Sequence, residues 1–331
     1  MADKPMARGF LSKLIMGFER EYGVMPVAPK GYDLPFNTFG VSMSKTLTAA
    51  GTLRGTRNPQ EPIPGRTDVS GDIQVPLDYV CMGYWFRALF GLPETTGGES
   101  SGPYTHAFKL HNDMESLWFE TMFATNPANY VLTNGIKLST LPLERIEEMT
   151  RLMGGDGELV ASIGTMGKVQ TISPASKAGS PSSPGFLRCN NDMGKLLLDG
   201  VEYGDATAFG IKLDNGLDGD TYTIGQSSTR AAISEGLATV SGTITVLFKD
   251  MELVNAALSL TPKKAEVVFA RGDNTLTFTL EELLFQTKVS TIDGPAGIRL
   301  PLDWQAYHSS GSLGSALAVT LKNTHASYAD A

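Results

Sequence analysis

The chain has 331 residues, of which 41% are hydrophobic and 19% charged, and it contains 36 glycines and 18 prolines. This length suits two domains that each bury a core, and the many turn-forming residues favour short strands over long helices. The formal net charge of −8 excludes a basic protein that grips nucleic acid, because phosphate neutralisation needs clustered lysines and arginines.

Cysteine usage and apolar runs exclude further classes. Cys81 and Cys189, the only cysteines, lie far apart without metal-ligand spacing, which favours two buried thiols over a disulfide framework or zinc site. The N-terminal segment lacks the continuous apolar region of a signal peptide, and no run of about 18 apolar residues occurs. We therefore expect a chain that folds in a cytoplasm and spans no membrane.

Residues 1–36 are predicted to form an N-terminal arm. Its apolar residues recur at helical spacing at Phe10, Leu11, Leu14, Ile15 and Phe18. The spacing predicts a short amphipathic helix, or an arm that packs on a neighbouring molecule.

Short alternating or β-branched segments follow the arm. They begin at Phe39, Asp72, Ala107 and Leu117, and turn residues separate them. This pattern is typical of an antiparallel sandwich or barrel. Residues 78–90 instead keep a 3.6-residue period and are followed by Gly91, which predicts one helix within the β pattern.

Turn signals continue beyond residue 130. Asn134-Gly135 favours a type I′ hairpin turn, and residues 157–169 form another predicted strand. The segment Ser173–Gly185 is so rich in serine, proline and glycine that it is predicted to be a linker. The expected division is an arm (1–36), a first β domain (37–172), a linker (173–196) and a second β domain (197–331).

Two stretches of the chain resemble each other in order and spacing. Phe39–Met43 matches Phe209–Leu213 at an offset of 170, from 39 to 209, and Val69–Val75 matches Val240–Val246 at an offset of 171, from 69 to 240. A helix-like block follows each. Duplication of one domain accounts for this order, although any two domains of short strands look somewhat alike. Ser-Gly before each Ile/Val strand predicts a bulge or a close backbone approach.

No convergent catalytic set is visible. The histidines that lie nearest each other, His106 and His111, fall on opposite faces of a predicted strand, and no nucleophile elbow, P-loop or zinc-protease motif occurs. Residues 214–220 superficially resemble a calcium loop, but Gly225 stands where the bidentate glutamate is required, which favours a hairpin turn. Trp85, Trp118 and Trp304 lie in apolar patterns that favour the core over a sugar-binding platform.

With these segments in place, the chain resembles the tail tube (major tail) proteins of bacteriophages with long non-contractile tails. The motifs occur in the order EREYGVMP, GTLRGTR…GRTDVSGDIQVPL, a helix ending in LFG, NGIKLSTLPL and GVEYGDATAFGIKL…VSGTITV…NAALS. The resemblance covers about residues 19–321. It implies a mainly β fold of two similar barrel or sandwich domains, each with a flanking helix, without catalytic, cofactor or metal residues.

The resemblance also implies a function and partners. Such proteins form rings that stack into the tube through which the genome enters the host, so the expected location is the virion tail, with assembly in the host cytoplasm. Two domains per chain predict a trimeric ring with pseudo-sixfold symmetry, a hexamer being the alternative. Tape measure and tail completion or tip proteins are implied partners, and DNA only passes through. A β-rich virion decoration or receptor-binding module remains the other candidate.

Candidate ring and stacking contacts lie in three places. A long loop carries arginines suited to reach a neighbouring subunit, and the two similar strands are candidates for lining or pairing. These residues are Arg54, Arg57, Arg66, Val69, Gly71, Ile73, Val75, Val240, Gly242, Ile244 and Val246.

Overall fold

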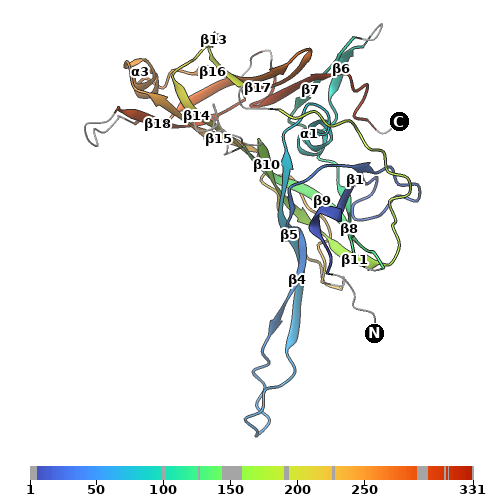
Figure 1. Ribbon diagram of the computed structural model, residues 1–331. Coiled ribbons are helices and arrows are strands. Elements are labelled where there is room, and N and C mark those ends of the chain that lie inside the picture. Colours follow the sequence, from blue (N-terminus) through green and yellow to red (C-terminus); the bar gives the residue numbers. More distant parts are fainter. Residues whose placement is uncertain are drawn as a thin grey trace.

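A computed structural model describes residues 6–98, 102–125, 127–143, 159–189, 194–225, 228–288, 297–308, 311 and 313–329. The described part is mainly β, as predicted, and every ladder between its strands is antiparallel (Figure 1). The ladders connect all strands into one sheet that is not closed into a barrel. The division into two domains therefore stays a prediction, and we call strands β1–β11 the first half and β12–β19 the second half.

The first half carries most of the elements. They are the 3-10 helix η1 (Gly9–Leu11), strands β1 (Lys13–Phe18), β2 (Tyr32–Asp33), β3 (Thr38–Phe39), β4 (Ser42–Thr48) and β5 (Ile63–Pro76), helix α1 (Met82–Phe90), and strands β6 (Glu94–Gly97), β7 (Tyr104–Lys109), β8 (Leu117–Phe123), β9 (Asn129–Leu143), β10 (Val160–Gly167) and β11 (Val169–Ser173). The second half contains β12 (Gly194–Leu198), β13 (Val201–Glu202), β14 (Ala206–Asp214), β15 (Thr239–Leu247), α3 (Glu252–Leu258), β16 (Lys263–Arg271), β17 (Asn274–Phe285), β18 (Arg299–Ala306) and β19 (Ala318–Asn323).

Both halves pair their strands in the same order. The first runs β4-β5-β10-β9-β8 and the second β14-β15-β18-β17-β16, and a helix follows the second strand of each set. The registers also agree with the sequence match, since Met43 pairs with Val69 while Leu213 pairs with Val240. The two halves thus share one topology.

A bulge occurs at the same register in both halves. In the ladder between β8 and β9, two residues of β9, Asn134 and Gly135, lie opposite one residue of β8. In the ladder between β16 and β17, Glu281 and Glu282 of β17 lie opposite one residue of β16 in the same way. The predicted hairpin turn at Asn134-Gly135 is therefore wrong. Gly135 has the expected positive φ of 66° but uses it inside a continuous strand.

The N-terminal apolar residues also adopt another structure than the predicted helix. Residues 13–18 form strand β1, which pairs with β8 along its whole length, and five of its six residues are buried. A short apolar run buried on both faces satisfies helical spacing by accident, so periodicity alone cannot separate the two structures.

The segment predicted as a linker packs on the N-terminal residues 1–36 and on β8. The Ser182 N–H donates to the Gly31 carbonyl (2.8 Å), Lys177 N donates to the Glu120 carboxylate (2.5 Å), and Ala178 is fully buried. Serine and proline content alone thus did not reveal that this segment is held in place.

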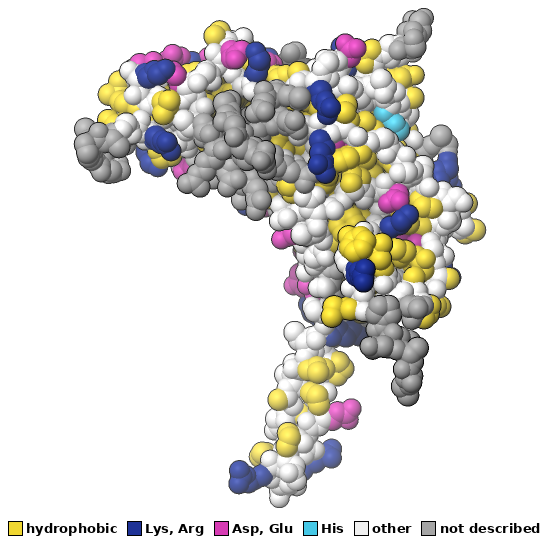
Figure 2. Space-filling view, viewed as in Figure 1, with side chains coloured by type: hydrophobic (Ala, Val, Ile, Leu, Met, Phe, Trp, Pro, Cys, Tyr) yellow, Lys and Arg dark blue, Asp and Glu magenta, His cyan; other side chains and the backbone are white. Residues whose placement is uncertain are grey.

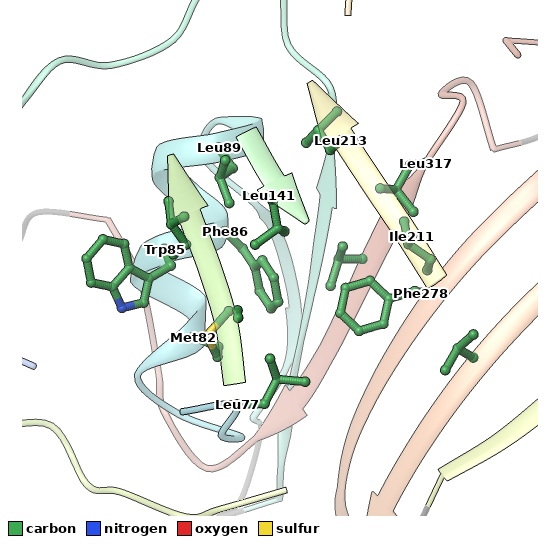
Figure 3. Close-up of a cluster of buried hydrophobic side chains, with 14 of the residues drawn as sticks. Leu77, Met82, Trp85, Phe86, Leu89, Leu141, Ile211, Leu213, Phe278 and Leu317 are labelled. Atoms are coloured by element: carbon green, nitrogen blue, oxygen red, sulfur yellow. The ribbon is translucent and has the colours of Figure 1, made fainter. Parts of the chain in front are cut away.

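One core extends through both halves. Helix α1 is buried along its entire length, and its residues belong to the same hydrophobic cluster as those of the second half. Figure 3 shows the α1 side chains beside residues of β9, β14 and β17, and the Phe86 and Phe278 rings lie 5.9 Å apart. The three tryptophans lie in the core, as predicted.

Candidate assembly surfaces

The β4–β5 hairpin is the feature that extends farthest from the body of the molecule (Figure 1). Its strands remain paired out to Thr48 and Ile63, and residues 49–62 connect them. We call residues 45–66 the hairpin arm. β4 is exposed along its entire length, and the apolar side chains of Leu47, Leu53 and Ile63 are 68%, 97% and 60% exposed.

The three predicted arginines all lie on this arm. Arg54 and Arg57 are exposed near its tip, which carries basic side chains in Figure 2. Arg66 lies at the base, where its guanidinium pairs with Asp220 of the second half (2.8 Å) and stacks over the Tyr222 ring. The arm therefore presents apolar and basic groups while its base contacts the second half.

The predicted strand contacts lie elsewhere. The six β-branched candidates are all buried and face the core of the chain, namely Val69, Ile73, Val75, Val240, Ile244 and Val246. They lie on two strands that do not pair with each other, β5 and β15, and neither set lies at the tip of the hairpin arm with Arg54 and Arg57 (Figure 1). Their side chains are therefore not exposed for contact with a neighbouring molecule.

The two candidate glycines explain the Ser-Gly signal. A Cβ on Gly71 would collide with the Gly40 carbonyl, and one on Gly242 would collide with the Gly210 carbonyl and the Trp304 ring. The predicted close backbone approach is therefore confirmed at equivalent positions of both halves. These glycines are structural requirements of the strand pairs.

The described residues of the connection between β14 and β15, 215–225 and 228–238, cover part of the first half. The Arg230 guanidinium donates to the carbonyls of Val69 (3.3 Å) and Gly167 (2.8 Å) and pairs with Asp68. Thr67 adds two hydrogen bonds, donating its N–H to the Ser228 carbonyl (2.8 Å) and accepting from Tyr222 at its own carbonyl (2.9 Å).

Electrostatics supports this cover. Burial alone raises the pKa of Asp68, but hydrogen bonds from Ser70 and Arg230 bring the pKa below its ordinary value. Nearby, the Lys137 ammonium contacts the Glu235 carboxylate (2.5 Å) and donates to the Ile233 carbonyl (2.9 Å). No local pattern in the sequence signals this cover, because every partner is remote along the chain.

The corresponding place in the second half is an open groove. It has a volume of about 600 Å³ and lies where β15 begins and where β7 and β18 end. The lining residues are Leu110–Asn112, Met114, Asn215, Glu235–Val240, Gln305–His308 and Gly314–Ala316. Val240 pairs with Ala306 in this groove, as Val69 pairs with Gly167 in the first half. The carbonyl groups of Val69 and Gly167 are the ones that Arg230 contacts.

The described residues hold no cluster of metal-ligating side chains. In the loop at residues 214–220, two aspartates accept from backbone N–H groups two residues ahead, which is turn geometry. Cys81 and Cys189 are buried free thiols, as predicted, and burial raises the pKa of Cys189 to about 12. No helix in the described ranges has the length and apolarity needed to cross a membrane.

Comparison with known proteins adds a family. The profile of a family described as phage tail tube protein matches residues 9–306. Comparison with curated proteins gave no match.

Proposed function

Because the chain belongs to the phage tail tube protein family, we propose that three copies form each ring of the tube, with six similar positions around the axis. Proteins of this family are structural components of the virion tail. Their general role is to assemble with one another into rings and to form the conduit for genome delivery.

The shared topology of the two halves is the observation that supports three chains in each ring. The same five-strand order, the same bulge and the same glycine contact occur twice in one chain. Two such units in each chain reduce the number of chains needed for six ring positions to three. The hexamer of chains is the alternative.

The proposed tube also implies how the protein meets DNA and which other proteins it meets. The acidic chain leaves few cations to hold DNA, so the genome passes without specific binding. Assembly takes place in the host cytoplasm, and tape measure and tail completion or tip proteins are the other partners. We propose no enzymatic activity. A glycan-binding decoration or receptor-binding module is disfavoured, because all three tryptophans are buried.

Electron microscopy and native mass measurement test this proposal. Negative-stain images of the purified protein should show rings or tubes with a central hole. The smallest ring should have a mass of about 106 kDa, three times the chain mass of 35.4 kDa. A ring of six chains would overturn the trimer, and a monomer at every salt concentration would overturn the assembly itself.

A further inference from the structure

The surface at Val69 and Gly167 in the first half and the groove at Val240 and Ala306 occupy equivalent positions in the shared topology, but only the first is covered. The β14–β15 connection, residues 215–238, covers the first half at Thr67, Val69 and Gly167. The strand pair equivalent to β14–β15 is β4–β5, whose connection is the hairpin arm. The arm should therefore cover the place in a second half that corresponds to Val69 and Gly167.

That place is the groove at Val240 and Ala306, and it is not covered by the arm of the same chain. Figure 1 shows the arm extending away from β15 and β18, whose residues line the groove. The contact of the hairpin arm with the second half of its own chain lies at its base, where Arg66 pairs with Asp220. An arm that fills the groove must come from another molecule.

We propose that the hairpin arm of a second copy of this chain docks into the groove at Val240 and Ala306, so that the junction between the halves is repeated between chains. This inference rests on the proposed ring, and it names the surfaces that join one chain to the next. Each arm is donated to the neighbour, and each groove receives one.

The chemistry of the arm fits this place. Leu47, Leu53 and Ile63 expose apolar surface that a neighbour would cover. Arg57 precedes Val69 by twelve residues and Arg230 precedes Val240 by ten, so the two arginines stand at similar distances before equivalent strands. Arg57 is therefore the counterpart of Arg230 and contacts backbone carbonyl groups at the groove, as Arg230 does at Val69 and Gly167.

The outer edge of β4 belongs to the same junction. The equivalent residues of β14, Ile211–Asp214, pair with Leu143–Thr140 of β9. At the start of β4, the Gln170 side chain contacts two of the corresponding backbone groups, accepting from Met43 N (2.8 Å) and donating to the carbonyl of Val41, the residue before the strand (3.2 Å). The Gln170 side chain thus occupies the edge of β4 at the place where β9 pairs with β14. The hairpin arm is therefore the main element that this chain donates to its neighbour.

Photo-crosslinking in assembled rings tests the docking. A benzoyl-phenylalanine at position 53, in place of Leu53, should crosslink to residues 238–240, 305–308 or 314–316 of another copy, identified by mass spectrometry of dimer bands. The same probe in place of Val201, which is 71% exposed on β13 and does not line the groove, should give no crosslink to these residues.

The outcomes separate the inference from the proposed function. Rings whose position-53 crosslinks fall only outside the groove overturn the docking and leave the tube protein intact. A protein that forms no rings overturns the proposed function.

A groove-filling variant gives a second measurement. Thr239→Trp places a large ring in the groove, where Thr239 is exposed, and should raise the concentration needed for assembly at least about tenfold, with the thermal unfolding midpoint unchanged. Val201→Trp is the matched control and should assemble like the wild type. Unchanged assembly of Thr239→Trp would contradict the docking.

Discussion

The two halves share strand order but differ in how their helices are buried. All nine residues of α1 are buried, whereas in α3 only Leu253, Val254, Ala256 and Ala257 are. The difference arises because α1 contacts β7 and β9 and the C-terminal segment at Tyr328, while α3 remains at the edge of the second half. The same topology thus serves once as the centre of the molecule and once as its periphery.

Glycine substitutions should show what the halves have in common. Gly71→Ala and Gly242→Ala each force a Cβ against a backbone carbonyl, and Gly71 also has a φ of 148°, so each should cost about 3 kcal/mol or more in unfolding free energy. Denaturant unfolding measures both. Gly204→Ala, where no heavy atom lies within 4 Å of the added Cβ, should stay within about 0.5 kcal/mol of the wild type. A tolerated Gly242→Ala would refute the equivalence of the two glycine contacts.

The ion pairs of the helices should show where the halves differ. Arg87 of α1 donates twice to the Glu115 carboxylate (2.7 Å each) and once to the Tyr328 carbonyl (2.8 Å) while 3% exposed. Arg87→Ala should cost about 3 kcal/mol, because it removes a buried guanidinium and leaves the carbonyl of buried Tyr328 and the partly exposed Glu115 carboxylate without this partner. Lys263→Ala, which breaks the contacts with Glu252 of α3 (3.2 Å) and with Asp199 (2.8 Å), two carboxylates that are more exposed than Glu115, should cost below about 1 kcal/mol. Equal losses would contradict the central role of α1.

The two β-bulges should lose different amounts of unfolding free energy when the glutamate at each is replaced by alanine. Glu19 follows β1, and its carboxylate accepts from Gly23 N (2.7 Å), Gly135 N (2.9 Å) and Asn134 Nδ2 (3.0 Å). Glu19→Ala leaves three donors without this partner and should cost about 2–3 kcal/mol in chemical denaturation. The matched variant Glu281→Ala removes an acceptor for Leu313 N and should cost about 1 kcal/mol. A larger loss in Glu281→Ala would reverse this ranking.

The start of α1 should make stability depend on pH. Burial raises the pKa of Asp78 to about 6, although its carboxylate accepts from Val80 N (2.6 Å) and Met82 N (3.2 Å). The folded state therefore binds the Asp78 proton more tightly than the unfolded state, so the contribution of Asp78 to stability is fully present below about pH 4 and is lost as pH rises through about 6.

Asp78→Asn should remove this dependence. Relative to the wild type, the variant should gain about 2 kcal/mol as pH rises from about 4 to 7, measured by unfolding at both values. A difference between the two proteins that does not change with pH would show that Asp78 is not the group responsible.

Much of the fold was predictable because it depends on local patterns. Alternation predicted the strands and the inward-facing Ile73 and Ile244, and the 3.6-residue period with Gly91 predicted α1. The Ser-Gly signal predicted the close approach at Gly71. The arginines of the hairpin arm were predicted as contact candidates, but the groove that we propose to receive them is lined by five stretches of the chain, so no local pattern revealed it.

The sequence by itself determined the β class, the core positions of the strands, the doubled order of elements and the membership in a family, because these depend on residue type and spacing. Only the tertiary structure decided that Asn134-Gly135 is a bulge, that residues 13–18 form a strand and that residues 215–238 cover the first half. Each of these depends on a partner far away in the chain, such as Glu19 for the bulge and β8 for β1. Local propensity is too weak to overrule such partners.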